Sequence, residues 1–129
     1  MPVKFEELKI LVVENVDRLG TMIESILHAV NTKQVFIARN SDHALVVYKI
    51  HTHDLLIVDL DVNTIGGIEL TKEIKKEKQN IPVILMASHM HFEAIRQAKE
   101  IGITDLLIKP FSFDDLMKHI NFVMDGKKT

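Results

Sequence analysis

Five short apolar segments recur along the chain, and the stretches between them carry apolar residues at helical spacing. Apolar runs that do not alternate with polar residues predict strands that are buried on both faces of a sheet. Apolar residues three and four positions apart predict helices that cover such a sheet. The five segments are residues 10–13, 35–38, 55–58, 83–87 and 106–108.

Strands that alternate with helices favour repeated strand–helix–strand units. We therefore predict an α/β fold, a doubly wound five-stranded parallel sheet with helices on both faces. Right-handed crossovers leave few possible strand orders. The flavodoxin-like order 2-1-3-4-5 is expected, and it places the first and third strands side by side at the switch point where ligands bind.

Capping residues locate the expected ends of the helices. Asp, Asn and Ser side chains commonly accept a hydrogen bond at a helix start, and glycine commonly follows a helix end. A third helix is expected from Ile68 to Lys78, and Phe113 is expected on the inward face of the last helix. The expected capping residues are Asp17, Asn40 or Ser41, Gly102, and Ser112 with Asp115 in a capping box.

Four polar side chains that directly follow apolar segments are the candidate site residues. Glu14 and Asn15 follow the first segment, Asp59 the third and Lys109 the fifth. Because the carboxyl ends of parallel strands meet at one edge of the sheet, Glu14, Asn15 and Asp59 are expected to share one crevice, with Lys109 nearby. A carboxylate at such an edge is partly desolvated, yet it can still reach water, a cation or a phosphoryl donor.

Length and charge narrow the possible classes of protein. The chain has 129 residues, which predicts one domain, placed here at residues 1–125 with a tail at 126–129. The formal net charge is −2, so nucleic acid and anionic membranes are not expected partners. There is no cysteine, which excludes disulfides and thiolate chemistry. The N-terminal residues are charged and contain neither a signal peptide nor a membrane span, so a cytoplasmic location is expected.

Five motifs, in order and at characteristic spacing, cover nearly the whole chain. They are ILVVEN (10–15), DLLIVDL (54–60), GGIEL (66–70), IPVILMA (81–87) and LIKPF (107–111). With these motifs the chain resembles the receiver domain of bacterial two-component response regulators, of the chemotaxis-regulator type. The resemblance implies a signalling domain rather than an enzyme, with at most self-catalysed phosphoryl transfer and dephosphorylation. It implies that Asp59 accepts a phosphoryl group from a histidine kinase or a phosphotransfer protein.

The same resemblance implies roles for the other polar residues. Lys109 would contact a phosphoryl oxygen, and the Lys109–Pro110 bond would be cis. A Mg²⁺ ion would be held by Glu14, Asn15, Asp59 and the backbone carbonyl of Asp61, because a hard cation with oxygen ligands offsets the repulsion between phosphoryl and carboxylate groups. The family usually has an acidic residue where this chain has Asn15, so a weaker affinity for Mg²⁺ is expected.

Two further departures from the family pattern leave two functions open. The hydroxyl residue that usually contacts the phosphoryl group is replaced by Ala87, and the switch aromatic is replaced by Leu106. In one interpretation the chain is a working receiver that switches by an atypical route. In the alternative it is a pseudo-receiver, a protein-interaction module that does not depend on phosphorylation. A flavin-binding protein fits poorly, because the acidic loop 14–17 would repel a phosphate in the absence of a metal.

The sequence also suggests where partners bind. The chain ends soon after the fifth helix, so output is expected through a downstream protein, or the chain is a fragment of a larger regulator. The face of the fourth helix, fifth strand and fifth helix is expected to bind a partner or a second copy as a homodimer. That face offers Phe92, Arg96, Lys99, Leu106, Lys118 and Asn121. The pairs His51/His53 and His89/His91 are interpreted as solvent-exposed loop residues rather than metal ligands.

Overall fold

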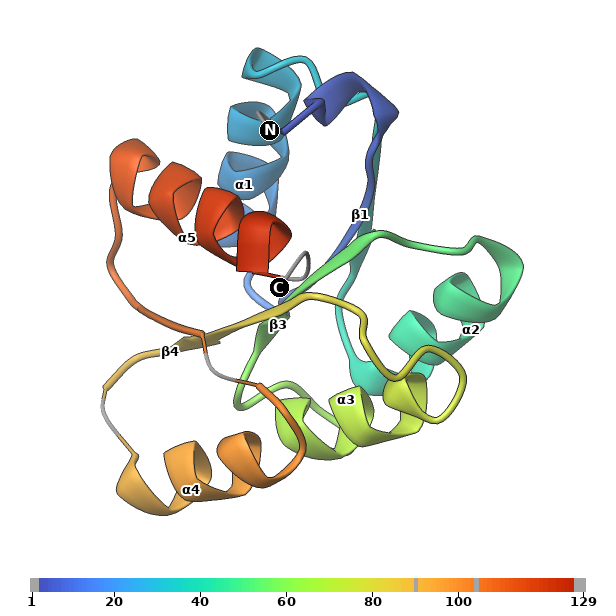
Figure 1. Cartoon of the computed structure of the whole chain (residues 1–129), viewed down its shortest axis with the longest axis vertical. Coiled ribbons are helices and arrows are strands. Elements are labelled where there is room, and N and C mark those ends of the chain that lie inside the picture. The colour runs from blue at the N-terminus through green and yellow to red at the C-terminus, as the bar shows by residue number, and fades with distance from the viewer. Residues whose placement is uncertain (1–2, 90, 104, 127–129) are drawn as a thin grey trace.

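The five strands form one parallel sheet in the order β2-β1-β3-β4-β5, as predicted (Figure 1). The structure is a computed structural model and describes residues 3–89, 91–103 and 105–126. The first and third strands are adjacent, with Val13 opposite Val58. The strands are β1 (Lys9–Val13), β2 (Gln34–Ala38), β3 (Leu55–Asp59), β4 (Val83–Ala87) and β5 (Leu106–Ile108).

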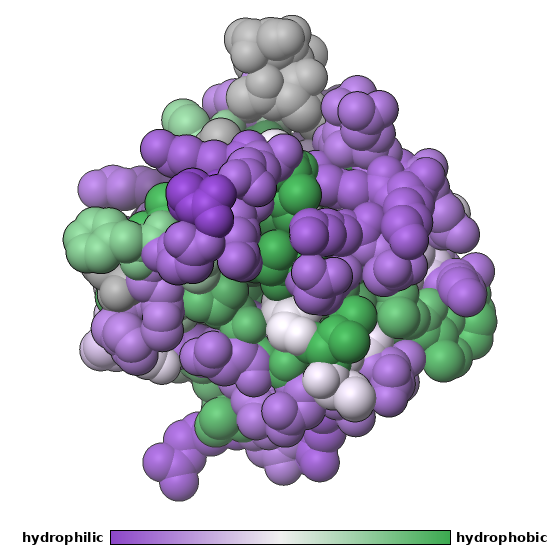
Figure 2. Space-filling view, turned by 90° about the horizontal axis from the view of Figure 1, so that it is seen from below, coloured by the Kyte–Doolittle hydropathy of each residue, from purple (hydrophilic) through white to green (hydrophobic). Residues whose placement is uncertain are grey.

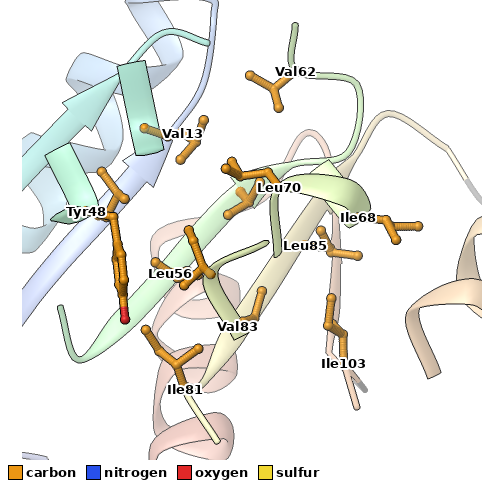
Figure 3. Close-up of a cluster of buried hydrophobic side chains, with 14 of the residues drawn as sticks. Val13, Tyr48, Leu56, Val62, Ile68, Leu70, Ile81, Val83, Leu85 and Ile103 are labelled. Carbon is orange, nitrogen blue, oxygen red and sulfur yellow. The ribbon is translucent and has the colours of Figure 1, made fainter. Parts of the chain in front are cut away.

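Helices cover both faces of this sheet. They are α1 (Asp17–Ala29), α2 (Ser41–Ile50), α3 (Gly67–Lys75), α4 (Phe92–Glu100) and α5 (Phe113–Gly126), preceded by the short 3₁₀ helix η1 (Phe5–Glu7). Successive strand side chains point to opposite faces, so Ile10 packs in the cluster under α1 and α5. Leu11 packs in the cluster under α2, α3 and α4, part of which Figure 3 shows. The core therefore has two apolar layers, one on each side of the sheet.

Most of the predicted helix ends are confirmed. Asn40 Oδ1 accepts a hydrogen bond from the His43 N–H at 2.8 Å, which makes Asn40 the cap of α2. Ser112 and Asp115 bond reciprocally to each other's backbone N–H at 3.0 Å, the expected capping box. Gly102 follows α4 with a φ of +86°, a conformation that favours glycine.

Three predictions about the helices are wrong. Asp17 is the first residue of α1 rather than its cap, because the capping position falls on Val16, which has extended backbone and makes no side-chain cap. α3 ends at Lys75 rather than Lys78, since the Lys78 carbonyl accepts a hydrogen bond from the Ile81 N–H as the chain turns toward β4. Phe113 is 46% exposed, because it precedes the buried face of α5, where Leu116 is fully buried.

Residues 127–129 of the predicted tail lie outside the described residues, and Gly126 is the last residue of α5. None of the helices in the described part of the chain is long and apolar enough to span a membrane.

Candidate functional site

Two acidic side chains and one lysine meet at the carboxyl edge of the sheet. The Lys109 Nζ lies 2.8 Å from Glu14 Oε1 and 2.8 Å from Asp59 Oδ1. Glu14 is 1% exposed and Asp59 5% exposed, so both carboxylates are nearly removed from solvent. The structure thus brings together the three charged residues that the sequence places after strands β1, β3 and β5.

The backbone of the sheet explains why these side chains converge. Because Val13 pairs with Val58, the next residues, Glu14 and Asp59, lie side by side on neighbouring strands. The Glu14 N–H donates to the Ala38 carbonyl at 2.9 Å, which holds Glu14 in line with β1. The Lys109 N–H donates to the Ala87 carbonyl at 2.8 Å, and the Lys109–Pro110 bond is cis, as the resemblance implied.

A close backbone approach fixes the far side of the site. A Cβ atom on Gly67 would lie 2.5 Å from the Asp59 carbonyl oxygen, so only glycine fits there. The Gly67 N–H donates to the Leu60 carbonyl at 2.9 Å. The start of α3 is therefore held directly against the end of the strand that carries Asp59.

The two carboxylates of the cluster affect the pKa of Lys109. Burial alone would lower the pKa of Lys109, but its hydrogen bonds to Asp59 and Glu14, together with the charges of these residues, outweigh burial and raise that pKa. Lys109 is therefore a cation at neutral pH. Two carboxylates and one ammonium leave the cluster with a formal charge of −1, which suits a further cation.

The oxygen ligands at this edge fit a hard divalent cation. Glu14 and Asp59 supply carboxylates, whereas the exposed Asn15 and Asp61 stand at the rim with amide and carbonyl oxygens. Mg²⁺ prefers such oxygen ligands and usually keeps several waters. In the described part of the chain, no group of three or more His, Cys, Asp or Glu side chains could hold a metal. An ion at this edge would therefore depend on the amide and carbonyl oxygens as well as on two carboxylates.

The last residue of β4 is Ala87, which has no hydroxyl. Ala87 is buried, and its neighbour Ser88 is exposed. Leu106 is partly buried and packs against the core under α4, beside a small pocket of about 40 Å³ that Ala87, His91 and Asp105 also line. By contrast, Phe92 at the start of α4 is 82% exposed. Of the two apolar residues considered for a partner surface, only Phe92 is freely presented to solvent.

The prediction of exposed histidines is wrong for His53. Its side chain is fully buried, with its ring 4.9 Å from the Phe36 ring and 5.6 Å from the Tyr48 ring. Neither ring nitrogen has a hydrogen-bond partner among the described residues. Burial is the main cause that lowers the pKa of His53 to about 4. Phe36 of β2 and Tyr48 of α2 cover His53. The residues next to His53 in the sequence are polar, so the sequence does not indicate that it is buried.

The other three histidines of these pairs differ in exposure. His51 is partly buried and stacks on Phe36 with ring centroids 4.4 Å apart. His89 is exposed, as predicted, and its ring lies 4.0 Å from that of His91. His91 is partly buried. The two pairs lie at opposite ends of the sheet, since one precedes β3 and the other follows β4.

A buried serine near the site was considered in the sequence only as a possible helix cap. Ser41 Oγ accepts hydrogen bonds from the Thr64 N–H at 2.6 Å and the Ile65 N–H at 2.9 Å. These contacts join the start of α2 to the loop between β3 and α3. The partners lie 23 and 24 positions apart in the chain, and no sequence pattern links them.

The sequence and the fold match one family of signalling domains. The family model of the response regulator receiver domain matches residues 10–121. The chain therefore belongs to the response regulator receiver family. Receiver domains are phosphoacceptor domains of two-component systems, and members of this family interact with histidine kinases and phosphotransfer proteins.

Individual relatives differ in length. The chain is 33% identical to sporulation initiation phosphotransferase F of Bacillus subtilis over 111 residues, which cover 84% of this chain and 86% of that protein. It is 32% identical to the transcriptional regulatory protein ZraR of Klebsiella oxytoca over 86% of this chain, but spans only 25% of that regulator. The fold matches a CheY-like receiver domain from Methanospirillum hungatei with a TM-score of 0.86 at 21% identity, over 95% of this chain and 98% of that one.

Proposed function

We propose that Asp59 accepts a phosphoryl group from the phosphohistidine of a histidine kinase or phosphotransfer protein. The observation that supports this proposal is the cluster itself, in which Lys109 bridges Glu14 and Asp59 at 2.8 Å each. Because the Lys109 Nζ lies within hydrogen-bonding distance of Asp59 Oδ1, it would also reach a phosphoryl group attached to Asp59. The family membership supplies the donor class.

The reaction is a transfer between two nucleophiles. An Asp59 carboxylate oxygen forms a bond to phosphorus while the bond from phosphorus to the donor imidazole nitrogen breaks, and the histidine leaves as imidazole. Lys109 contacts a phosphoryl oxygen as a point charge and stabilises the negative charge there. Glu14, Asn15, Asp59 and the Asp61 carbonyl are the residues that would hold Mg²⁺. When bound, this ion supplies positive charge that offsets the repulsion between phosphoryl and carboxylate oxygens.

Intact-mass measurement after incubation with a small-molecule phosphodonor and Mg²⁺ tests the proposal. We expect one phosphoryl adduct on the natural chain and none on Asp59→Asn. The matched control is Asp54→Asn, because Asp54 precedes the same strand at the opposite edge, where its Oδ2 accepts from the Lys9 N–H. That control should still form the adduct. An adduct that persists in Asp59→Asn would contradict the assignment.

A second candidate function is the pseudo-receiver. It is favoured by Asn15 and by the buried Ala87, which leave the site short of one acidic ligand and one hydroxyl. In this case the chain binds its partner without phosphorylation. The absence of any adduct on the natural chain, together with no detectable Mg²⁺ binding, would decide for this function.

The surface of α4, β5 and α5 is the proposed site for a downstream protein or a second copy. Phe92 gives it an exposed aromatic ring, and Arg96, Lys118 and Asn121 give it exposed polar groups. Arg96 is already bonded to Glu93 and Glu100 on its own helix. Seen from below, the molecule is mostly hydrophilic with smaller hydrophobic areas (Figure 2). With one exposed ring and several exposed polar groups, an interface on α4, β5 and α5 would combine a few apolar contacts with polar ones. A cytoplasmic location is part of the proposal.

A further inference from the structure

The loop between β3 and α3, residues 60–66, carries Asp61 and is closed at its base by the backbone. The Gly67 N–H donates to the Leu60 carbonyl at 2.9 Å, and the Val62 N–H donates to the Asp59 carbonyl at 3.3 Å. The Val62 side chain is buried. The tip of the loop is different, because Asn63 and Thr64 are exposed. Its position therefore depends on contacts with another element.

Those contacts come from the first turn of α2. Ser41 is fully buried, and its Oγ accepts from both the Thr64 N–H at 2.6 Å and the Ile65 N–H at 2.9 Å. A hydroxyl oxygen has two acceptor lone pairs, so this pair of bonds uses its full accepting capacity. The Ser41 N–H also donates to the Asn63 carbonyl. Thr64 Oγ1 adds a bond to Asp42 Oδ2 at 3.1 Å.

We propose that Ser41 is a positioning residue for the divalent cation of the phosphorylation site. Its hydroxyl holds the tip of loop 60–66 against α2. The tip continues directly from the turn 59–62, which carries the Asp61 carbonyl and which the single 3.3 Å bond from the Val62 N–H closes, so the tether helps to fix that carbonyl. This inference rests on the proposed function of the site. Ser41 itself does not touch the ion. It acts by positioning loop 60–66, which carries the Asp61 carbonyl.

Two physical arguments connect the tether to cation affinity. Mg²⁺ demands near-ideal octahedral geometry, so a ligand that moves is a poorer ligand. The exposed Asn15 brings no charge to the site, which increases the share of the affinity that depends on the Asp61 carbonyl. Without the Ser41 oxygen, the Thr64 and Ile65 N–H groups would bond to water at the exposed tip. The loop, and Asp61 with it, would then occupy several positions.

The test is Ser41→Ala in the full chain, with two measurements besides phosphorylation. Amide chemical shifts during a Mg²⁺ titration give the affinity, and hydrogen exchange reports the Thr64 and Ile65 N–H groups. Loss of groups that orient a metal ligand typically weakens binding by at least tenfold, so the dissociation constant should rise about tenfold. The two amides should exchange faster. At saturating Mg²⁺, the rate of adduct formation should return close to that of the natural chain.

Two variants control for a general effect on α2. Asn40→Ala removes the cap at the same helix start, where Asn40 Oδ1 accepts from the His43 N–H, but leaves the Ser41 hydroxyl in place. Its Mg²⁺ affinity should be unchanged. Ser41→Cys keeps a small side chain with a weaker acceptor, so its affinity should lie between those of Ser41→Ala and the natural chain. It also provides the decisive measurement if Ser41→Ala does not fold.

The outcomes separate this inference from the proposed function. A natural chain that binds Mg²⁺ and forms the adduct, beside a Ser41→Ala variant with the same affinity, overturns the positioning role alone. An equal loss of affinity in Asn40→Ala also overturns it, since helix stability would then be the cause. A natural chain that neither binds Mg²⁺ nor forms the adduct overturns both.

Discussion

The two edges of the sheet bury polar groups in opposite ways. At the carboxyl edge, Glu14, Asp59 and Lys109 remain charged groups that satisfy one another by direct pairing. At the amino edge, His53 lies among aromatic rings with no partner for either nitrogen in the described part of the chain, and its lowered pKa keeps it neutral. A buried charge needs a counter-charge, whereas a buried titratable group without one gives up its charge. The carboxyl edge therefore holds paired charges, whereas the amino edge holds a neutral ring.

The largest expected effect on stability comes from removing the charge of Lys109, which Glu14 and Asp59 share. Lys109→Met leaves two carboxylates side by side and nearly buried, so we expect the free energy of unfolding to fall by about 3 kcal/mol, as for other broken buried pairs. Urea unfolding followed by circular dichroism measures this. The control is Lys72→Met, which breaks an exposed pair with Glu69 at 3.2 Å and should cost less than about 1 kcal/mol. Equal losses in the two variants would contradict the account of the charged edge.

The next effect is a pH dependence of the stability, which arises from His53 at the amino edge of the sheet. The pKa of His53 is about 4 in the folded chain and about 6.5 when unfolded, so the unfolded chain binds more protons below pH 6.5. Stability is therefore full above pH 6.5 and falls as the pH drops, by about 3 kcal/mol at pH 4. Because carboxylates also titrate there, the quantity to measure is the difference between the natural chain and His53→Leu.

The variant His53→Leu should lack this part of the pH dependence. His43→Leu, on the exposed surface of α2, serves as the control and should keep it. If His53→Leu and the natural chain lose stability in parallel between pH 7 and pH 4, His53 is not the group responsible.

A smaller effect is expected when a charge is added to the carboxyl edge. Asn15→Asp restores an acidic residue beside Glu14 and should tighten Mg²⁺ binding about tenfold, since ligand charge strongly tunes such sites. Without the ion, it should lower the free energy of unfolding by about 1 kcal/mol or less through repulsion at the exposed rim. Calorimetric titration and urea unfolding measure the two effects.

The matched control for that variant is Asn80→Asp, which adds the same charge at an exposed position just before β4, at the amino edge. Its Mg²⁺ affinity should equal that of the natural chain. Tighter binding in both variants would mean that the net charge of the molecule, rather than a ligand at position 15, attracts the ion.

The smallest effect belongs to an ion pair that is not buried. Arg39 and Asp17 pair across the surface near the start of α1, and both side chains are more than half exposed. Arg39→Ala should change the free energy of unfolding by less than about 0.5 kcal/mol, the usual range for exposed pairs. Thermal and urea unfolding provide the measurement. A loss comparable to that of Lys109→Met would show that burial is not what distinguishes the charged cluster.

Much of the fold follows from short-range signals in the sequence. Apolar runs predict the strands, and the limited set of crossovers predicts their order. The three charged residues could be placed together because each follows a strand, and parallel strands end at one edge. Asp17 was misplaced as a cap, since capping depends on the backbone conformation of Val16 rather than on residue type alone.

Other features could not be read from the sequence. The burial of His53 depends on Phe36 and Tyr48, which lie in other elements and cover it only after folding. The bonds from Ser41 to Thr64 and Ile65 depend on how α2 sits beside the loop of another element. Both require tertiary structure, which local periodicity does not encode.

The bond between Glu14 and Lys109 joins residues 95 positions apart. While the chain is being synthesised, the ribosome releases both acids long before the lysine that neutralises them. The newly made N-terminal part therefore carries a repulsive pair that no earlier residue of the cluster can relieve. The charged cluster can therefore assemble only after the fifth strand, which carries Lys109 at its end, has been made and has docked.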